Sequence, residues 1–141
     1  MIATTPKQSA QLLEFGVDPN TADMTYMPYG TLSTTHFSKE LEERGCTPAW
    51  SLSALLTSVL PKQLEGFPFT KWREPFYSDE ICEMDSEGVL NGDLKIYSNG
   101  SKWIVDYDWD GFSGVLPQSE NPIEAAILAI ELLHANNFKF I

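Results

Sequence analysis

Apolar and polar positions follow a helical pattern near the end of the chain, from Asn121 onward. Asn121 suits the N-cap, because its side-chain oxygen can accept a hydrogen bond from a first-turn amide, and Pro122 suits the first helical position. Apolar residues occupy most of the helix circumference, whereas Glu124 and Glu131 share one narrow polar face. The pattern therefore predicts a largely buried helix over 122–135.

The beginning of the chain repeats this arrangement of helix signals. The segment TPKQ at 5–8 places a glutamine three positions after a capping threonine, with a proline between them. A helix is therefore predicted over 6–15, with Gly16 at its end. Ser38 is expected to cap a brief helix that runs through Arg44 and stops at Gly45. The asparagines at 136–137 are expected to end the last helix in a left-handed conformation.

A third long helix is predicted over 52–60, within the segment TPAWSLSALLTSVLP at 47–61. Either Ser51 or Ser53 can act as its N-cap. The leucines and the valine that follow recur with helical spacing and form one apolar face. Pro61 ends the helix, because the residue before a proline resists helical backbone angles.

Residues 94–109 carry the clearest β pattern of the chain. Two extended stretches, 94–97 and 102–109, flank the segment SNGS at 98–101, whose central Asn-Gly pair favours a tight hairpin turn. In the second stretch the residues alternate with period two, which is typical of a strand with one buried and one solvated face. The predicted buried face comprises Trp103, Val105, Tyr107 and Trp109, and the solvated face comprises Lys102, Ile104, Asp106, Asp108 and Asp110.

Weaker signals fill the remaining stretches. The aromatic segment 67–72 and the segment 81–84 are predicted to be extended, whereas 86–92 is predicted to be a loop. Residues 25–37 are predicted to be irregular, with a short extended piece from residue 32 onward. A third strand near 112–116 is expected to join the hairpin, because an isolated hairpin is only marginally stable.

These elements predict an α+β fold in one domain over 1–141. Hydrophobic residues make up 43% of the chain, which suffices for one core. A small antiparallel sheet, built from the hairpin and at least one more strand, is expected to pack against about three helices. These are the helices over 6–15, 52–60 and 122–135.

Acidic residues outnumber basic residues by 20 to 9, which gives a formal charge of -11. This charge argues against direct binding to nucleic acids, since lysine and arginine are needed to displace counterions from phosphates, and against binding to anionic membranes. No segment is long and apolar enough to span a bilayer, and the first residues lack the pattern of a signal peptide. Cys46 and Cys82 have no paired spacing and indicate free thiols, so a cytoplasmic location is expected.

Three alternating aspartates form the candidate metal site. Asp106, Asp108 and Asp110 precede Gly111, which matches the opening D-x-D-x-D-G of a calcium-binding loop. The twelfth position of such a loop should be a bidentate glutamate, and here it is Pro117. We favour the alternative interpretation, in which the aspartates are the solvated face of an alternating strand.

Residues 74–93 contain seven acidic residues and no lysine or arginine. Complementary charge steers association, so this run is a candidate surface for a basic protein partner. Tyrosine, tryptophan and methionine favour interfaces, which adds the cluster YMPY at 26–29 and Trp50, unless these aromatic side chains fold against the core. The candidate partner-binding residues are Tyr26, Tyr29, Trp72, Asp79 and Glu80.

Signals of catalysis are weak. His36 and His134 have no cysteine or carboxylate at metal-ligand spacing, and Cys46 would need a neighbouring base to act as a nucleophile. The chain has no glycine-rich phosphate loop and no G-x-S-x-G or H-E-x-x-H motif. We predict no catalytic residue and no cofactor. An enzyme of unrecognised type is the competing class, and it would need a pocket that gathers carboxylates, Cys46 or a histidine.

Four segments together resemble a group of uncharacterised small acidic proteins encoded in gut-bacterial genomes, phages and mobile elements. The resemblance covers most of the chain. It implies a compact α+β domain and a phage or mobile-element context, and it implies no activity and no catalytic residue. The segments are TPAWSLSALL at 47–56, VLP at 59–61, IYSNGSKWIVDY at 96–107 and NPIEAA at 121–126.

The sequence therefore predicts a non-enzymatic, cytosolic protein-interaction module of phage or mobile-element type. Its sharper form is an acidic inhibitor of a basic partner, such as a toxin, a nuclease or a DNA-binding protein. The alternatives are the enzyme of unrecognised type and a calcium-binding module built on the three aspartates. The partner is expected to be a protein, with no direct contact to nucleic acid or membrane.

Overall fold

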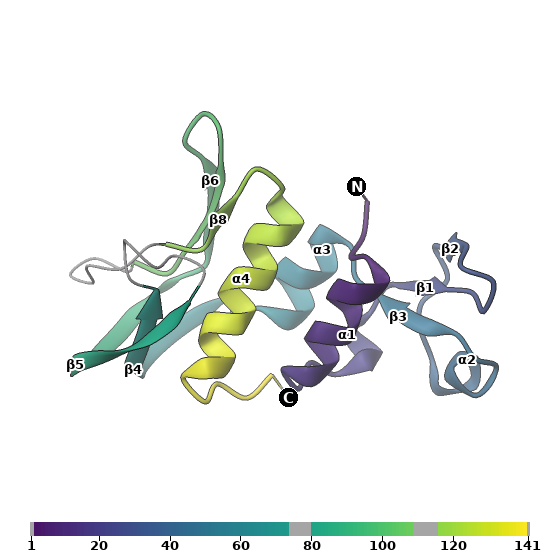
Figure 1. The fold of residues 1–141 in the computed structure, drawn as a ribbon, viewed down its shortest axis with the longest axis horizontal. Helices are drawn as coiled ribbons and strands as arrows, with labels where there is room; N and C mark the ends of the chain where they lie inside the picture. The colour runs from purple at the N-terminus through teal and green to yellow at the C-terminus, as the bar shows by residue number, and fades with distance from the viewer. Residues whose placement is uncertain (1, 74–79, 109–115, 141) are drawn as a thin grey trace. The chain divides into compact units, whose positions relative to one another are not determined.

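The computed structural model describes residues 2–73, 80–108 and 116–140 (Figure 1). It contains both helices and antiparallel strands, which confirms the predicted α+β class. The strands form three small sheets where the sequence predicted one. The chain divides into two compact units: unit 1 is Met1–Leu60 with Lys139–Ile141, and unit 2 is Pro61–Phe138. The single domain over 1–141 stays a prediction.

Unit 1 begins with helix α1 (Pro6–Glu14), whose predicted cap is confirmed. The Thr5 hydroxyl accepts from the Gln8 amide at 3.1 Å, and the Gln8 side chain accepts from the Thr5 amide at 2.9 Å. Gly16 ends the helix as predicted, with a positive φ of 85° that glycine adopts without steric cost. The amides of Gly16 and Val17 donate to carbonyls of the last helical turn, which ends α1 abruptly.

Three short strands form the sheet of unit 1, in the order β2-β1-β3. β2 falls within the extended piece predicted from residue 32 onward. The sequence pattern misses β1 and β3, because strands of three residues are too short to show alternation. The elements are the 3₁₀ turn η1 (Pro19–Thr21), β1 (Met24–Tyr26), β2 (Leu32–Ser33) and β3 (Thr47–Ala49).

The helix predicted over 52–60 is present, but its second half is a π-helix. Ser51 is its N-cap, since the Ser51 hydroxyl accepts from the Ala54 amide at 3.1 Å. The Leu60 amide donates to the Leu55 carbonyl at 2.8 Å, and this five-residue spacing marks the wider π turn. The remaining elements of unit 1 are α2 (Lys39–Glu43), α3 (Leu52–Ala54) and the π-helix η2 (Leu55–Val59), which continues α3.

Trp50 is fully buried in the core of unit 1, so its predicted place on a recognition surface is wrong and the alternative, that it folds against the core, is confirmed. Its indole N–H donates to the Thr21 hydroxyl at 2.9 Å, and its backbone amide donates to the Thr4 hydroxyl at 3.0 Å. The Thr4 amide donates in turn to the Trp50 carbonyl at 2.9 Å. These bonds satisfy the polar groups of a large buried side chain and fix the first residues of the chain to the core.

Unit 2 begins with a long antiparallel hairpin of β4 (Gln63–Arg73) and β5 (Ile81–Asp93). The segments 67–72 and 81–84, predicted to be extended, lie within these strands and are confirmed. The prediction of a loop over 86–92 is wrong, because β5 continues through it. The glycines of this segment favour turns in a sequence, but here they pair with residues of β4.

The pairing of β4 with β5 shifts in register between Phe69 and Lys71. Asn136, the C-cap residue of the last helix, fills this interruption. Its side-chain oxygen accepts from the amides of Thr70 and Lys71, both at 2.9 Å. Its amide group donates to the carbonyls of Lys71 at 3.1 Å and Leu132 at 2.9 Å. A buried asparagine thus supplies the bonds that the irregular strand does not.

The hairpin predicted over 94–109 is confirmed as β6 (Lys95–Ser98) and β7 (Trp103–Asp106). Its turn lies one residue later than predicted. The Asn99 amide donates to the Lys102 carbonyl at 3.1 Å, so the turn is centred on Gly-Ser and not on Asn-Gly. The glycine adopts a positive φ of 105°, as the first central position of such a turn requires.

The predicted faces of the second strand are confirmed in part. Val105 and Tyr107 are fully buried, as expected. The assignment is wrong for Trp103, which is 38% exposed at the start of β7, and for Ile104, which is 6% exposed. β7 is the central strand of its sheet, in the order β6-β7-β8, and is buried on both faces at these positions. Trp109 lies outside the described residues.

The third strand of this sheet is β8 (Gln118–Ser119), which pairs with β7. It was predicted near 112–116, and 112–115 lie outside the described residues. Helix α4 (Pro122–Ala135) follows and packs against β4, β7 and β8 (Figure 1). Its Asn121 cap is confirmed, since the Asn121 side chain accepts from the Ile123 amide at 2.8 Å.

The end of α4 differs slightly from the prediction. Asn137 adopts the left-handed conformation at a φ of 68°, whereas Asn136 does not. The helix is buried around most of its circumference, as its sequence indicates. Within the described part of the chain, no helix has the length and apolar character needed to cross a membrane.

Candidate functional site

The acidic charge is divided unevenly between the two units. Residues 61–138 contain 14 acidic and 5 basic residues, a formal charge of -9. Residues 1–60 and 139–141 contain 6 acidic and 4 basic residues, a formal charge of -2. Unit 2 therefore carries most of the negative charge of the chain.

Strand β5 and the residue before it present four exposed carboxylates, which we name the β5 acidic segment. Val89 lies within the same stretch and is 56% exposed, so an apolar side chain reaches the surface among the acids. Glu74 and Asp79, from the same acidic run of the sequence, lie outside the described residues. The β5 acidic segment comprises Glu80, Glu83, Glu87 and Asp93.

The ion pairs in the described part of unit 2 use other carboxylates. The Arg73 guanidinium donates to Glu131, and Lys95 Nζ donates to Asp108 Oδ1 at 2.5 Å. The hydrogen bond to Asp108 and the charge of this carboxylate raise the pKa of Lys95. The carboxylates of the β5 acidic segment take no part in these pairs. The charge of Asp93 adds to the raised pKa of Lys95, whereas Glu80, Glu83 and Glu87 are open to cations of a partner.

The aspartates of the predicted calcium loop face side chains of β6. The Tyr97 hydroxyl donates to Asp106 Oδ2 at 3.4 Å, and Lys95 pairs with Asp108. In the residues that the structure describes, no group of three or more His, Cys, Asp and Glu side chains is placed to hold a metal. Asp110 lies outside those residues, so the calcium site stays a prediction.

The aromatic candidates for partner binding differ in exposure. Tyr29 is 77% exposed in the turn between β1 and β2. Tyr26 is half-buried: its hydroxyl donates to the Thr4 carbonyl at 2.9 Å, and its ring packs against a small apolar cluster. Trp72 is 3% exposed and lies inside unit 2, so its burial removes it from the surface. Of the candidates in unit 2, Glu80 is exposed.

A surface hollow of about 180 Å³ lies in unit 1. Its buried lining residues form an apolar floor, and exposed or half-buried residues form its rim, which includes one carboxylate. The floor is formed by Phe37, Cys46 and Pro48, and the rim by Leu13, Pro19, Glu42 and Thr47.

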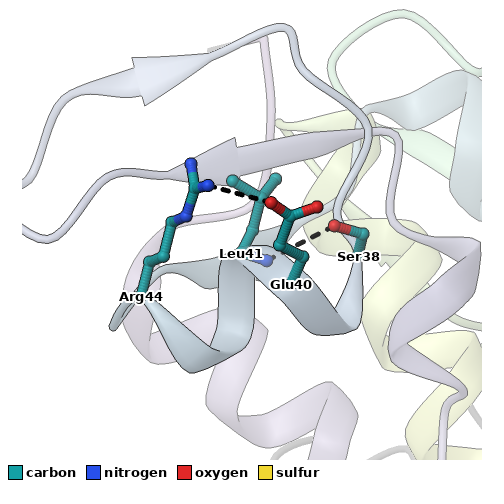
Figure 2. A network of polar contacts seen from close by, with 4 residues as sticks. All are labelled: Ser38, Glu40, Leu41 and Arg44. Carbon is teal, nitrogen blue, oxygen red and sulfur yellow. Dashed lines mark hydrogen bonds and ion pairs between the residues drawn. The ribbon is translucent and has the colours of Figure 1, made fainter.

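Helix α2 contributes Glu42 to the lining of this hollow. Figure 2 shows the polar contacts of this helix. The Ser38 hydroxyl accepts from the Leu41 amide at 3.4 Å, which confirms the predicted cap. The Arg44 guanidinium donates to Glu40 Oε1 at 2.8 Å, one helical turn away. The Cys46 amide donates to the Leu41 carbonyl at 3.0 Å, so the chain turns back directly after α2.

The hollow holds two of the groups that the enzyme alternative names, Cys46 and one carboxylate, so this alternative stays a prediction. Cys46 lines the hollow together with a single carboxylate, and neither histidine is among its lining residues. His36 is exposed, and its ring bonds to the Phe37 carbonyl at 2.9 Å. His134 is exposed in the last turn of α4. Among the lining residues of the hollow, Glu42 is the one carboxylate.

Sequence reasoning missed this hollow. Its lining residues come from α1, η1, the loop before α2, α2 itself and β3, which are separated by loops. No spacing in the sequence connects them, because the hollow exists only once these elements pack together.

Comparisons of the chain with protein-family models, with curated proteins and with solved structures give no match. The function is therefore inferred from the residues of this chain, chiefly from the charge of unit 2 and the hollow in unit 1.

Proposed function

We propose that this protein is a non-enzymatic, cytosolic interaction module that binds a basic protein partner through unit 2. The observation that supports this proposal is the concentration of charge, with -9 in residues 61–138 and -2 in the remainder. Exposed charges act over roughly 8 Å at physiological ionic strength. A strongly acidic unit therefore attracts a cationic surface and speeds the encounter with it.

The β5 acidic segment is the part of unit 2 best suited to this contact. Its four carboxylates are exposed, and the described ion pairs leave them unused. Val89 adds an exposed apolar side chain in their midst. Charged residues around an apolar contact are typical of the rim and core of protein interfaces.

Inhibition is the action that this surface supports best. Toxins, nucleases and DNA-binding proteins that act on nucleic acid use lysine and arginine to contact phosphates. An acidic protein that covers those cations competes directly with the nucleic acid. The phage or mobile-element context, which the sequence resemblance implies, belongs to this proposal as a prediction.

The test is a quantitative pull-down from host lysate with a triple variant of the β5 acidic segment, E80Q/E83Q/E87Q. The native protein is expected to retain a basic protein at low salt and to release it as the salt concentration rises. The triple variant is expected to retain several-fold less, because three exposed carboxylates are replaced by neutral side chains of the same shape.

A matched control removes the same amount of charge from unit 1. The variant E14Q/E40Q/E43Q replaces three exposed glutamates and leaves unit 2 unchanged. It is expected to bind the partner nearly as well as the native protein. Equal retention by both triple variants, or binding that does not respond to salt, would show that the charge of unit 2 is not what recognises a partner.

A further inference from the structure

We infer that the hollow in unit 1 is a docking pocket for one apolar side chain of a basic partner segment, and that Glu42 pairs with the lysine or arginine next to that side chain. This inference rests on the proposed function, because it takes the partner to be basic. It adds the anchoring residue and the kind of sequence that the partner presents.

The size and the floor of the hollow fit a single large apolar side chain. A cavity of about 150 Å³ is enough to hold a molecule of the size of benzene, and the hollow measures about 180 Å³. Phe37 and Cys46 at its floor are 3% and 4% exposed. An aromatic ring or a leucine side chain in the hollow would exchange water for these apolar surfaces.

The rim adds a charge preference. Arg44, the arginine of α2, is directed to Glu40 (Figure 2), and Glu42 has no ion pair within the described residues. Glu42 is exposed, and its amide donates to the Ser38 carbonyl at 3.0 Å, so the capped helix α2 holds its backbone in place. A cation that stands outside the hollow, beside an inserted apolar side chain, therefore meets a carboxylate open to pairing.

The two contacts have different roles. Anchoring side chains that fill pockets supply most of the affinity of protein interfaces, and charges at the rim mainly supply specificity. The position of the apolar floor inside the hollow and of Glu42 at its rim also determines which partner residues fit. The buried floor lacks a carboxylate, so a lysine entering alone would place its ammonium group against apolar surface, whereas an apolar residue followed by a lysine satisfies both floor and rim.

The test uses three short peptides: acetyl-Phe-Lys-amide, acetyl-Phe-Gln-amide and acetyl-Ala-Lys-amide. Each is titrated into the full-length protein, and binding is followed by NMR chemical shifts of the hollow's lining residues. The first peptide is expected to bind with millimolar affinity. Loss of the ring is expected to weaken binding about tenfold, because the apolar contact is lost. Loss of the lysine charge is expected to weaken binding about two- to fivefold, as for an exposed ion pair.

Three protein variants make the assignment specific. E42Q removes the charge at the rim and should weaken acetyl-Phe-Lys-amide about as much as replacing its lysine, with no further loss when both changes are combined. E43Q removes a neighbouring exposed charge that does not line the hollow and should leave the affinity unchanged. L13A trims the apolar rim and should weaken the two phenylalanine peptides equally, and its melting temperature shows that the variant is folded.

Shifts that fail to saturate, shifts outside the hollow, or equal effects of E42Q and E43Q would overturn the inference. Such a result is distinct from failure of the proposed function. If the E80Q/E83Q/E87Q variant loses its partner while the peptides do not bind in the hollow, unit 2 binds a basic partner and the hollow does not anchor that partner. If the peptides bind as expected but the pull-down retains no basic protein, the hollow binds an apolar side chain beside a cation, and the proposed role of unit 2 is wrong.

Discussion

The side chain of Asn136 bonds to both backbone polar groups of Lys71, accepting from the amide at 2.9 Å and donating to the carbonyl at 3.1 Å. An adjacent strand would make the same pair of bonds. Lys71 is also in register with Glu83 of β5, so the asparagine adds these bonds to β4 next to the point where the register of the hairpin shifts. It also bonds to Thr70 and Leu132, so one side chain joins β4 to the end of α4.

Replacing Asn136 by alanine is expected to lower the free energy of unfolding by about 3 kcal/mol, because two strand amides lose their acceptor and a buried carbonyl loses a donor. Urea denaturation of the native protein and the variant measures this. Asn137→Gly is the control at the neighbouring position. It preserves the left-handed conformation and should change the stability by less than about 0.5 kcal/mol. Equal effects of the two substitutions would show that the Asn136 bonds add nothing.

Gly92 lies against the end of the neighbouring hairpin, and its lack of a side chain permits this approach. A Cβ atom at this position would lie 2.6 Å from the Tyr107 carbonyl oxygen and 2.7 Å from Asp108 Oδ2. Gly92→Ala is expected to cost about 2–3 kcal/mol through overpacking. The comparison is Gly100→Ala, where the space is open and only the positive φ of 105° is unfavourable, at about 1 kcal/mol. Thermal denaturation of both variants tests whether Gly92→Ala lowers the stability more than Gly100→Ala does.

The buried hydroxyl of Tyr107 makes the stability of the protein depend on pH in the alkaline range. This hydroxyl donates to the Pro61 carbonyl at 2.6 Å, and burial raises its pKa well above the ordinary value of 10.0. Above about pH 10 the unfolded chain loses this proton and the folded chain keeps it, so the stability conferred by the neutral phenol is lost as the pH rises. Below that pH the contribution is fully present.

The expected loss from Tyr107 is about 1.4 kcal/mol for each pH unit above 10. The variant Tyr107→Phe cannot ionise at this position and should show a shallower decline between pH 9 and about pH 11. It should be less stable than the native protein at neutral pH by about 1 kcal/mol, because the hydrogen bond is lost. Identical slopes for the two proteins would mean that Tyr107 ionises as readily in the fold as in the unfolded chain.

Asp23 supports the start of α3 through Ser51. The Ser51 hydroxyl donates to Asp23 Oδ2 at 2.5 Å, and the Ser51 amide donates to Oδ1 at 2.9 Å. Asp23→Ala is expected to destabilise the protein by about 2 kcal/mol, since both donors lose a charged acceptor. Asp23→Asn retains one acceptor oxygen and should cost about half as much. Chemical denaturation at neutral pH measures both changes in stability. An Asp23→Ala variant as stable as the native protein would show that Asp23 does not stabilise the start of α3.

Features decided by residues close in sequence were predictable here. The box formed by Thr5 and Gln8 is confirmed, as are the caps at Ser38 and Asn121, because each cap joins residues at most three positions apart. The hairpin of β6 and β7 is confirmed for the same reason. Its turn moved by one residue, since Asn-Gly and Gly-Ser are both able to form a tight turn.

Features decided by distant residues were not predictable. β5 continues where a loop was predicted because β4 pairs with its glycines: Gly88 pairs with Phe69, 19 residues earlier in the chain, and Gly92 pairs with Leu64, 28 residues earlier. Trp72 was selected as an interface residue for its residue type, yet packing makes it 3% exposed. The hollow beside Glu42 has no sequence signal, since its floor and rim come from separate elements.

The bonds of Asn136 also impose an order on the synthesis of the chain. Lys71 lies 65 residues before Asn136, so β4, β5, β6 and β7 are all synthesised before α4 exists. Each hairpin pairs neighbouring segments and is able to close early, but until α4 emerges the amides of Thr70 and Lys71 have water as their partner. The β4–β5 hairpin therefore gains its hydrogen bonds to Asn136 only after the last helix has been synthesised.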